Sequence, residues 1–125
     1  MLPKQNRLKR MKDFEILFKE GRFVNGEFTD LKIWKIEPEK YPKRGYLKGD
    51  LKIAFVVTKK ISKSAVKRNR IKRQMREVVR LLLKENKIKP GFMVLVMAKP
   101  AVLEKEYLEI ENSISGVLKK AGLNK

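Results

Sequence analysis

The chain has 125 residues, with 32 Lys and Arg against 14 Asp and Glu and a formal net charge of +18 at pH 7. This length predicts one compact domain, residues 1–125, with a single core. The absence of Cys and His excludes disulfides, thiolate nucleophiles, imidazole metal ligands and every catalytic arrangement built on a histidine base. Such a charge excess opposes compaction unless a polyanion neutralises it, so a nucleic-acid-binding domain is favoured over an independent enzyme.

The N-terminal part predicts an arm followed by a short helix. The first residues are basic and lack apolar periodicity, so residues 1–5 are expected to form a mobile arm. Residues 13–20 predict a helix in which Phe14 and Phe18 share a face with Leu17. Because a helix this short is not stable alone, it must dock on the rest of the domain.

Extended chain is predicted next. Residues 28–37 follow an Asn25-Gly26 turn signal, and Leu31 and Ile33 alternate with polar or mixed neighbours, which predicts one inward face. Residues 37–50 contain Pro, Gly and many charges and are predicted to be a loop. Residues 51–58 are apolar at successive positions, which is typical of a central strand covered on both faces.

A long basic helix is predicted from Ser64, a favourable N-cap residue, to about Asn86. At 100° per residue its apolar positions fall within about 40° of one another. These positions are Ile71, Met75, Val78 and Leu82. The opposite arc carries Asn69, Arg70, Lys72, Arg73, Arg76, Arg80 and Lys84, whereas Arg68 lies beside the apolar stripe and is expected along the helix flank.

The charge of this helix favours a polyanionic partner. Residues 59–80 contain ten Lys or Arg and one acid, Glu77. The alternative interpretation is an ordinary solvated face, but such faces usually mix charges at i,i+4 spacing. Repulsion between like charges destabilises this helix unless a partner such as nucleic acid removes it.

The C-terminal part completes the layout. Residues 92–98 form an apolar run between Pro90-Gly91 and Pro100, which predicts a buried strand. Apolar residues at helical spacing from Leu103 to Ala121 then predict a helix that packs by one side. The predicted fold class is α/β, an α+β sandwich of about four strands and three helices.

Three segments together resemble the bacterial ribonuclease P protein subunit, over residues 6–21, 53–80 and 91–100. They are Arg68-Asn69-Arg70-Ile71-Lys72-Arg73 after Lys59-Lys60-Ile61; Asn6-Arg7-Leu8-Lys9 with Asp13-Phe14 and Phe18-Lys19-Glu20-Gly21; and Gly91-Phe92 with an apolar run ending in Lys99-Pro100. The order of the elements also agrees with that family.

The resemblance implies a ribosomal-protein-S5-domain-2-like fold with a mixed sheet and a left-handed β-α-β crossover, a rare hand. It also implies a noncatalytic partner of a catalytic RNA. Because the sequence shows neither a long apolar segment nor a signal peptide, we expect a cytoplasmic protein with no membrane partner. Because it shows no helix-turn-helix pattern, we expect no DNA partner. In this family the ribonuclease P RNA, with Mg²⁺ required by the holoenzyme, removes the 5′ leader of precursor tRNA, and the protein holds no tightly bound cofactor.

The resemblance implies two sets of site residues. The RNA-binding helix would use Lys67, Arg68, Asn69, Arg70, Lys72, Arg73, Arg76 and Arg80. The 5′-leader cleft would use Arg7, Phe14, Phe18, Leu31, Lys59, Lys60 and Arg68. No residue is assigned as catalytic or as a metal ligand. Asp13 and Glu15 are the acids near the expected leader cleft, but a single carboxylate beside many Lys residues is a poor site for Mg²⁺.

Plainer interpretations remain open. Phe14 and Phe18 are also typical of core residues, and Lys59 and Lys60 of solubility charges at a strand end. Many family members carry an aromatic residue near the position of Leu31. Alternative functions are another structural RNA-binding protein such as a ribosomal protein, a DNA-binding regulator using the long helix, and a nuclease using carboxylates and Mg²⁺.

Overall fold

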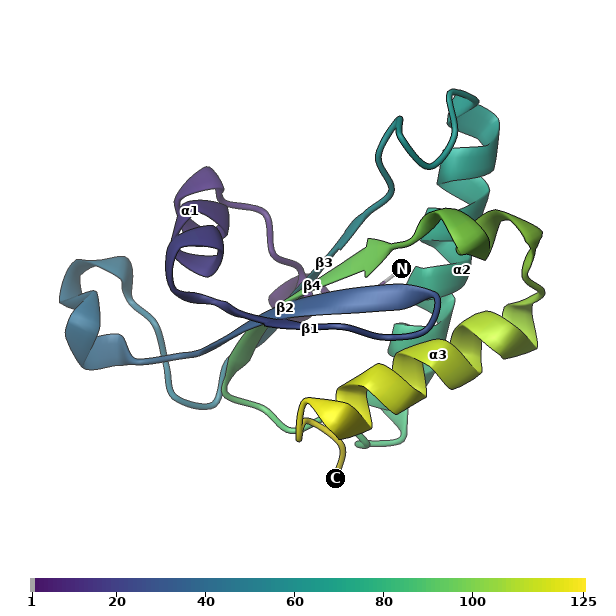
Figure 1. The fold of residues 1–125 in the computed structure, drawn as a ribbon. Helices are drawn as coiled ribbons and strands as arrows, with labels where there is room; N and C mark the ends of the chain where they lie inside the picture. The colour runs from purple at the N-terminus through teal and green to yellow at the C-terminus, as the bar shows by residue number, and fades with distance from the viewer. Residues whose placement is uncertain (1) are drawn as a thin grey trace.

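Three helices and four strands form the protein, as the computed structural model of residues 2–125 shows (Figure 1). In chain order they are α1 (Met11–Glu20), β1 (Arg22–Val24), β2 (Thr29–Lys35), β3 (Leu51–Val56), α2 (Ala65–Lys84), β4 (Phe92–Ala98) and α3 (Tyr107–Lys120). Short 3-10 helices occur at Lys4–Asn6, Pro38–Lys40, Pro42–Arg44 and Pro100–Glu104. The predicted α+β architecture is confirmed.

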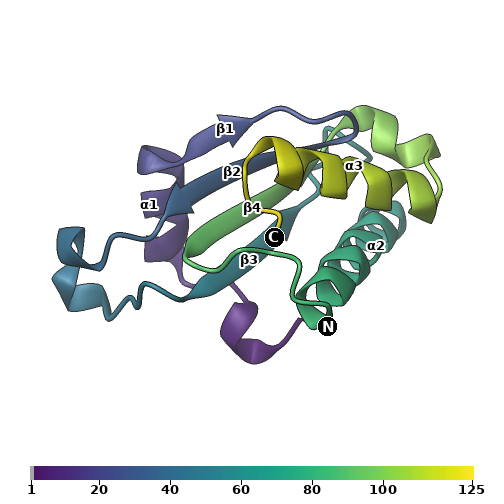
Figure 2. The same cartoon turned by 90° about the horizontal axis from the view of Figure 1, so that it is seen from below.

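The strands form one mixed sheet in the order β1-β2-β4-β3. The β1–β2 and β2–β4 pairs are antiparallel, and β3 and β4 are parallel, with α2 connecting them. In Figure 2, α2 lies in front of the sheet, and β3 and β4 run from lower left to upper right. When the picture is turned so that these strands point up, β4 lies to the left of β3. The crossover is therefore left-handed.

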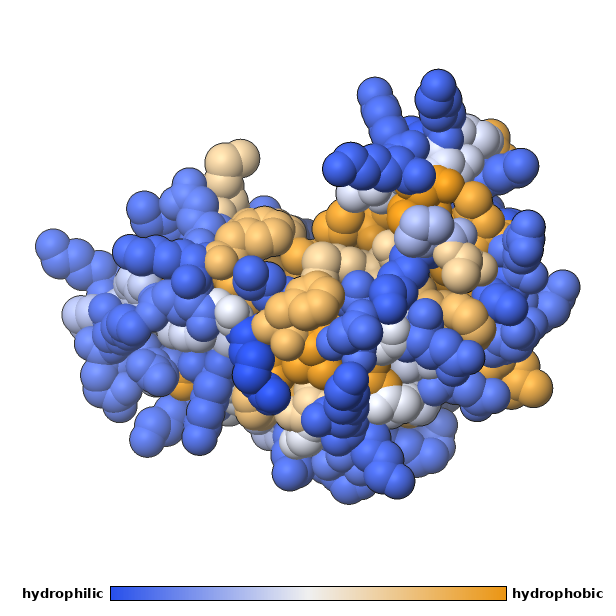
Figure 3. Space-filling view, in the orientation of Figure 1, coloured by the Kyte–Doolittle hydropathy of each residue, from blue (hydrophilic) through white to orange (hydrophobic). Residues whose placement is uncertain are grey.

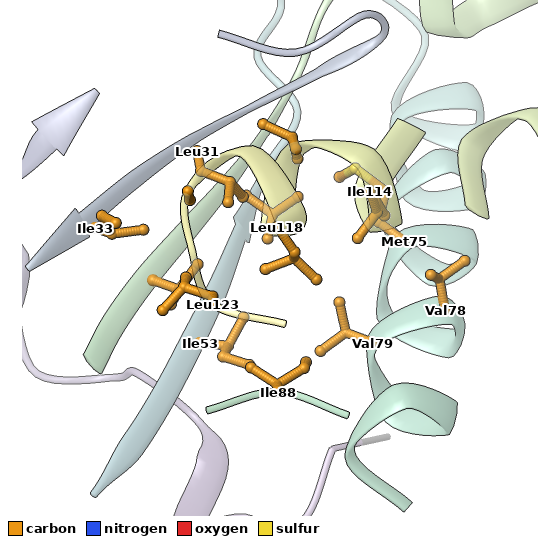
Figure 4. Close-up of a cluster of buried hydrophobic side chains, with 14 of the residues drawn as sticks. Leu31, Ile33, Ile53, Met75, Val78, Val79, Ile88, Ile114, Leu118 and Leu123 are labelled. Atoms are coloured by element: carbon orange, nitrogen blue, oxygen red, sulfur yellow. The ribbon is translucent and has the colours of Figure 1, made fainter. Parts of the chain in front are cut away.

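Helices α2 and α3 cover one face of the sheet, and α1 lies on the other (Figures 1 and 2). The larger core cluster lies between the sheet and α2 and α3, where Leu31 and Ile53 meet Met75 and Ile114 (Figure 4). The apolar stripe predicted for α2 is buried at Ile71, Met75 and Val78, with Leu82 partly buried. A smaller cluster, including Leu17, Trp34 and Met93, lies beneath α1.

The structure differs from the sequence-based expectations at the last helix, at β3 and at the N-terminus. The last helix begins at Tyr107 rather than Leu103, because residues 100–104 form a separate 3-10 helix. β3 is an edge strand rather than a central one. Its outer edge is covered instead by the N-terminal segment, because Arg7 bridges Ile53 and the Leu8 amide donates to the Ile53 carbonyl at 3.1 Å. Leu2 is buried in the larger cluster, so this part of residues 1–5 packs rather than forming the expected mobile arm, and Met1 lies outside the described residues.

None of the helices described within residues 2–125 combines the length and the apolar character needed to cross a membrane.

Candidate nucleic-acid interface

The N-terminal half of α2 carries a dense set of exposed basic residues. The Ser64 hydroxyl accepts a hydrogen bond from the Lys67 amide at 3.3 Å, which caps the helix as predicted. Lys67, Asn69, Arg70 and Arg73 are exposed, and Lys72 and Arg76 are half-buried. Asn69, Arg73 and Arg76 line one shallow depression, so the helix presents an amide and two guanidinium groups together.

Arg68 lies on the helix flank, as its position beside the apolar stripe predicts. Its Nη1 donates to the Ser62 carbonyl at 2.7 Å, and the side chain is half-buried. This bond secures the segment between β3 and α2, where Lys59 and Lys60 are exposed. Arg70 Nη2 also approaches a backbone acceptor, the Leu103 carbonyl, at 3.4 Å.

Arg80 differs from the other predicted RNA-binding residues because it already has an acidic partner. Its Nη2 and Nε donate to the two Glu77 carboxylate oxygens at 2.6 and 2.9 Å. These hydrogen bonds lower the pKa of Glu77 and raise the pKa of Arg80. Within residues 2–125, no such ion pair is formed by Arg73 or Arg76, so the unpaired basic face extends from Lys67 to Arg76.

A groove of about 360 Å³ connects this face to α1. Its lining combines basic and aromatic side chains from four parts of the chain: Arg7 and Lys9 before α1, Phe14 on α1, Phe55 on β3, and Lys72 and Arg76 on α2. The structure therefore brings two of the predicted helix contacts, Lys72 and Arg76, next to two of the predicted cleft residues, Arg7 and Phe14; Phe18, Lys59, Lys60 and Arg68 do not line this groove. The sequence did not single out Phe55, because its alternation with Ile53 assigned it to the core; on an edge strand its ring also reaches the groove.

From this groove, the predicted 5′-leader cleft continues across the face of the sheet that α1 covers. Figure 3 shows a hydrophobic patch in the hollow between α1 and the start of α2, bordered by hydrophilic side chains. Ala54, Val56 and Met97 are partly buried and, like Phe14, pack against the smaller core cluster beneath α1. Phe18 is 55% exposed, and Lys32 Nζ lies 5.7 Å from the centre of its ring.

Leu31 does not line this cleft, so its assignment there was wrong. Its side chain is 0% exposed and belongs to the cluster beneath α2 and α3. Since side chains alternate along a strand, the neighbouring Lys32 and Trp34 face α1 instead. The alternation of residues 30–34 in the sequence contained this information.

The acids on α1 are engaged by the protein itself. Asp13 is 3% exposed and accepts hydrogen bonds from the Tyr46 hydroxyl at 2.6 Å and from Arg44 Nη2 at 3.4 Å. Glu15 pairs with Lys12 at 3.5 Å. The carboxylate of Asp13 is therefore not open to a Mg²⁺ ion, and no group of three or more potential metal-ligating side chains occurs within residues 2–125.

Segment 37–50 positions α1 from its outer side. Besides Tyr46 and Arg44 at Asp13, Tyr41 and Lys40 donate to Glu20 in the last turn of the helix. The rings of Tyr41 and Tyr46 each lie 5.8 Å from Trp34 in edge-to-face contacts. Both ends of α1 are thus attached to a segment whose sequence predicted only a loop.

Comparison with known proteins identifies the family. The family model for Ribonuclease P matches residues 2–122. The ribonuclease P protein component of Pseudanabaena is 36% identical over 121 residues, covering 97% of this chain and 95% of the relative. That of Clostridium kluyveri is 34% identical over 119 residues, covering 95% and 96%.

Solved structures agree with these sequence matches. The Staphylococcus aureus RNase P protein superposes with a TM-score of 0.73 at 27% identity, covering 98% of this chain and 100% of that one. The Thermotoga maritima RNase P protein shares the fold, with a TM-score of 0.71 and coverage of 91% and 96% at 24% identity. The chain belongs to the bacterial ribonuclease P protein family.

Proposed function

We propose that this chain binds the ribonuclease P RNA through α2 and the 5′ leader of precursor tRNA through the cleft beside α1. The observation that carries this proposal is the groove in which Lys72 and Arg76 of α2 meet Phe14 of α1. One continuous surface would then contact both the ribonuclease P RNA, which carries out the cleavage, and the 5′ leader, which is removed. The complex would act in the cytoplasm.

The residue types suit these two ligands. Arginine guanidinium groups donate forked hydrogen bonds to phosphate, and a rigid helix fixes the spacing of Arg70, Arg73 and Arg76 against a folded RNA backbone. An aromatic and apolar cleft bordered by cations can stack bases and bind phosphates with little dependence on base identity. Such tolerance suits an enzyme that processes precursor tRNAs with different leaders.

The cleavage chemistry is assigned to the RNA. The sequence lacks His and Cys, and Asp13 is occupied by Tyr46 and Arg44. Mg²⁺ bound by the RNA would polarise the phosphodiester and activate the attacking water. The protein would contribute affinity and position: its cations would neutralise phosphates where leader and RNA approach each other.

The test is reconstitution of precursor tRNA cleavage with a bacterial ribonuclease P RNA. Adding the protein should raise kcat/KM for a precursor with a leader, and the protein alone should leave the precursor intact. Cleavage by the protein alone would show that it carries catalytic groups. A lack of stimulation would contradict the subunit role and favour a different RNA-binding function.

A further inference from the structure

A cavity of about 660 Å³ lies at the outer edge of β3, outside the groove and the 5′-leader cleft. Its walls come from the N-terminal 3-10 helix, the start of β3 and the C-terminal end of α2, which meet there (Figure 2). Pockets that hold small ligands have volumes of about 300 to 1,000 Å³. We call this depression the β3-edge cavity.

The apolar lining of the β3-edge cavity places it on the side of the sheet that α2 covers. Leu51 and Ile88 are buried in the larger core cluster, and Leu83 packs against that cluster. Among residues 2–125, the smaller cluster beneath α1 contributes nothing to the lining. The cavity is therefore separate from the face on which the 5′ leader is proposed to bind.

The side of α2 that carries Arg76 leads to the β3-edge cavity. Arg76, Arg80 and Lys84 follow one another at i,i+4 spacing and so lie along one side of the helix, over about 12 Å. Arg76 lines the groove, whereas Arg80 and Lys84 line the cavity, and Leu2 lines both. Lys84 is exposed and forms no ion pair within residues 2–125. An RNA bound along this side of α2 would therefore reach the cavity.

The charge of the lining favours an anionic ligand. Its basic side chains are those of Arg80, Lys84 and Lys125. Among the described residues, Asp50 is the one acid that lines the cavity, and its Oδ2 accepts a hydrogen bond from the Leu47 amide at 3.1 Å. A phosphate group entering the cavity therefore meets more positive than negative charge.

Side-chain amides give the cavity hydrogen-bonding groups. Asn6 Nδ2 donates to the Leu51 carbonyl at 2.8 Å, so its Oδ1 remains an acceptor. Asn86 Oδ1 accepts from Lys125 Nζ at 2.6 Å, so its Nδ2 remains a donor. Because the edge of a nucleic-acid base presents donors and acceptors side by side, this pair of amides suits a base.

We propose that the β3-edge cavity binds one unpaired nucleotide of the ribonuclease P RNA. The base would lie on Leu51 and Leu83 with its edge at the two asparagine amides, and its phosphate would contact Lys84. This inference rests on the proposed function, because the RNA bound along α2 supplies the nucleotide. Proteins recognise folded RNAs largely through unpaired bases that leave the stack.

The cavity gives the protein a means of selecting this RNA. Cations on a helix bind the phosphates of any RNA, whereas a base held at its edge carries sequence information. Because α2 presents many cations, phosphate contacts alone also allow more than one register of the RNA along the helix. A nucleotide in the cavity would fix one register and discriminate ribonuclease P RNA from other RNAs.

The test fills the cavity without changing its charge. Gly49 lines the cavity, and a Cβ atom added there meets no atom within 4 Å, so Gly49→Trp can place an indole ring in the space for the base. Gly116→Trp is the matched control, because Gly116 on α3 is equally open and lies outside the cavity. The affinity of the whole protein is measured for ribonuclease P RNA and for an unrelated structured RNA of the same length, over a salt series.

Gly49→Trp should lower the affinity for ribonuclease P RNA about fivefold or more, which is the scale of one lost base contact. The salt slope and the affinity for the unrelated RNA should not change, because no phosphate contact is removed. Chemical probing of the RNA should reveal one unpaired base that the unmodified protein and Gly116→Trp protect and that Gly49→Trp leaves reactive.

Lys84→Gln, at an exposed position, tests the cavity even if Gly49→Trp does not fold. It should make the salt slope shallower by about 0.9 and raise the reactivity of the same base. If Gly49→Trp folds and its affinity and probing pattern are unchanged, or if it loses affinity for both RNAs equally, the proposal is wrong. If it does not fold, an unchanged probing pattern with Lys84→Gln overturns the proposal.

Arg73→Gln separates this failure from failure of the proposed function. Arg73 is exposed on the basic face of α2 and does not line the cavity. If Arg73→Gln lowers the affinity for ribonuclease P RNA and Gly49→Trp does not, the RNA binds α2 without the cavity. If neither variant lowers the affinity, both proposals fail.

Discussion

Glu77 limits the basic face of α2 because both of its carboxylate oxygens accept hydrogen bonds from Arg80. Glu77→Gln should release the Arg80 guanidinium for phosphate and raise affinity for ribonuclease P RNA several-fold. The slope of log K against log salt should steepen by about 0.9, the increment for one more phosphate contact. Filter binding or fluorescence anisotropy over a salt series measures both quantities.

Glu15→Gln is the matched control for this prediction. Glu15 also pairs at i,i+3 spacing, with Lys12 on α1, so this variant loses the same charge and the same kind of ion pair. It should leave the salt slope for the RNA unchanged. Equal gains in the two variants would mean that net charge, rather than release of Arg80, controls affinity.

Phe14 is half-buried and contacts both the smaller core cluster and the groove, so packing and ligand binding must be separated. Phe14→Leu keeps an apolar side chain but removes the ring that a base can stack on. It should lower the affinity for precursor tRNA about fivefold or more and leave the affinity for mature tRNA unchanged, because only the precursor carries a leader. Parallel binding assays of the two RNAs check this, and equal losses would indicate a folding role for Phe14.

At the scale of elements, segment 37–50 fixes the position of α1 and therefore the width of the cleft. Burial raises the pKa of Tyr46, so its hydroxyl stays protonated and donates to the buried Asp13. Tyr46→Phe removes this donor and should destabilise the fold by about 1 to 3 kcal/mol, the usual cost of losing a hydrogen bond to a buried charged group. Precursor affinity should fall while affinity for the ribonuclease P RNA stays constant.

Tyr107→Phe is the corresponding control on α3. The Tyr107 hydroxyl is buried and has no hydrogen-bond partner among the described residues. Its removal should leave stability unchanged or slightly improved, and both RNA affinities intact. Thermal unfolding and the two binding assays distinguish the variants. If Tyr46→Phe lowers the affinities for precursor tRNA and for ribonuclease P RNA equally, segment 37–50 has a general structural role rather than one in shaping the cleft.

Helices and strands could be predicted from the sequence where either helical or alternating spacing of apolar residues alone determines the buried face. The stripe of Ile71, Met75 and Val78 follows from helical spacing, and alternation placed Leu31 on the inward face. The resemblance pointed to a cleft position for Leu31, and here local alternation was the better guide. Apolar residues on both faces of residues 51–56 did not distinguish a central strand from an edge strand covered by the N-terminal segment.

Other features were beyond reach of the sequence because they join distant residues. The Asp13–Tyr46 hydrogen bond spans 33 positions, and neither residue type alone indicates a partner. The register that sets Phe23 opposite Lys32 likewise depends on the loop after β1. The pairing of Arg80 with Glu77 was visible as i,i+3 spacing, although spacing alone does not show that both donors engage.

At the scale of the whole molecule, the net charge of +18 should make RNA binding strongly dependent on salt. If α2 and the groove together contact six or more phosphates, affinity should fall by about 10³ or more between about 50 and 200 mM monovalent salt. Titrations across this range give the slope directly. A shallow slope would contradict a phosphate-binding face and favour recognition through the apolar cleft alone.

If ribonuclease P RNA binds the basic face of α2, its affinity depends on the cations of that face more than on the net charge of the protein. The most direct measurement compares Arg73→Gln/Arg76→Gln with Lys89→Gln/Lys119→Gln, which removes two exposed charges outside α2. We expect the α2 double variant to lose about tenfold or more in affinity for ribonuclease P RNA, with a salt slope shallower by about 1.8, and the control variant to keep nearly the full affinity. Equal losses of affinity in the two variants would show that the RNA responds to the net charge of the protein and not to the basic face of α2.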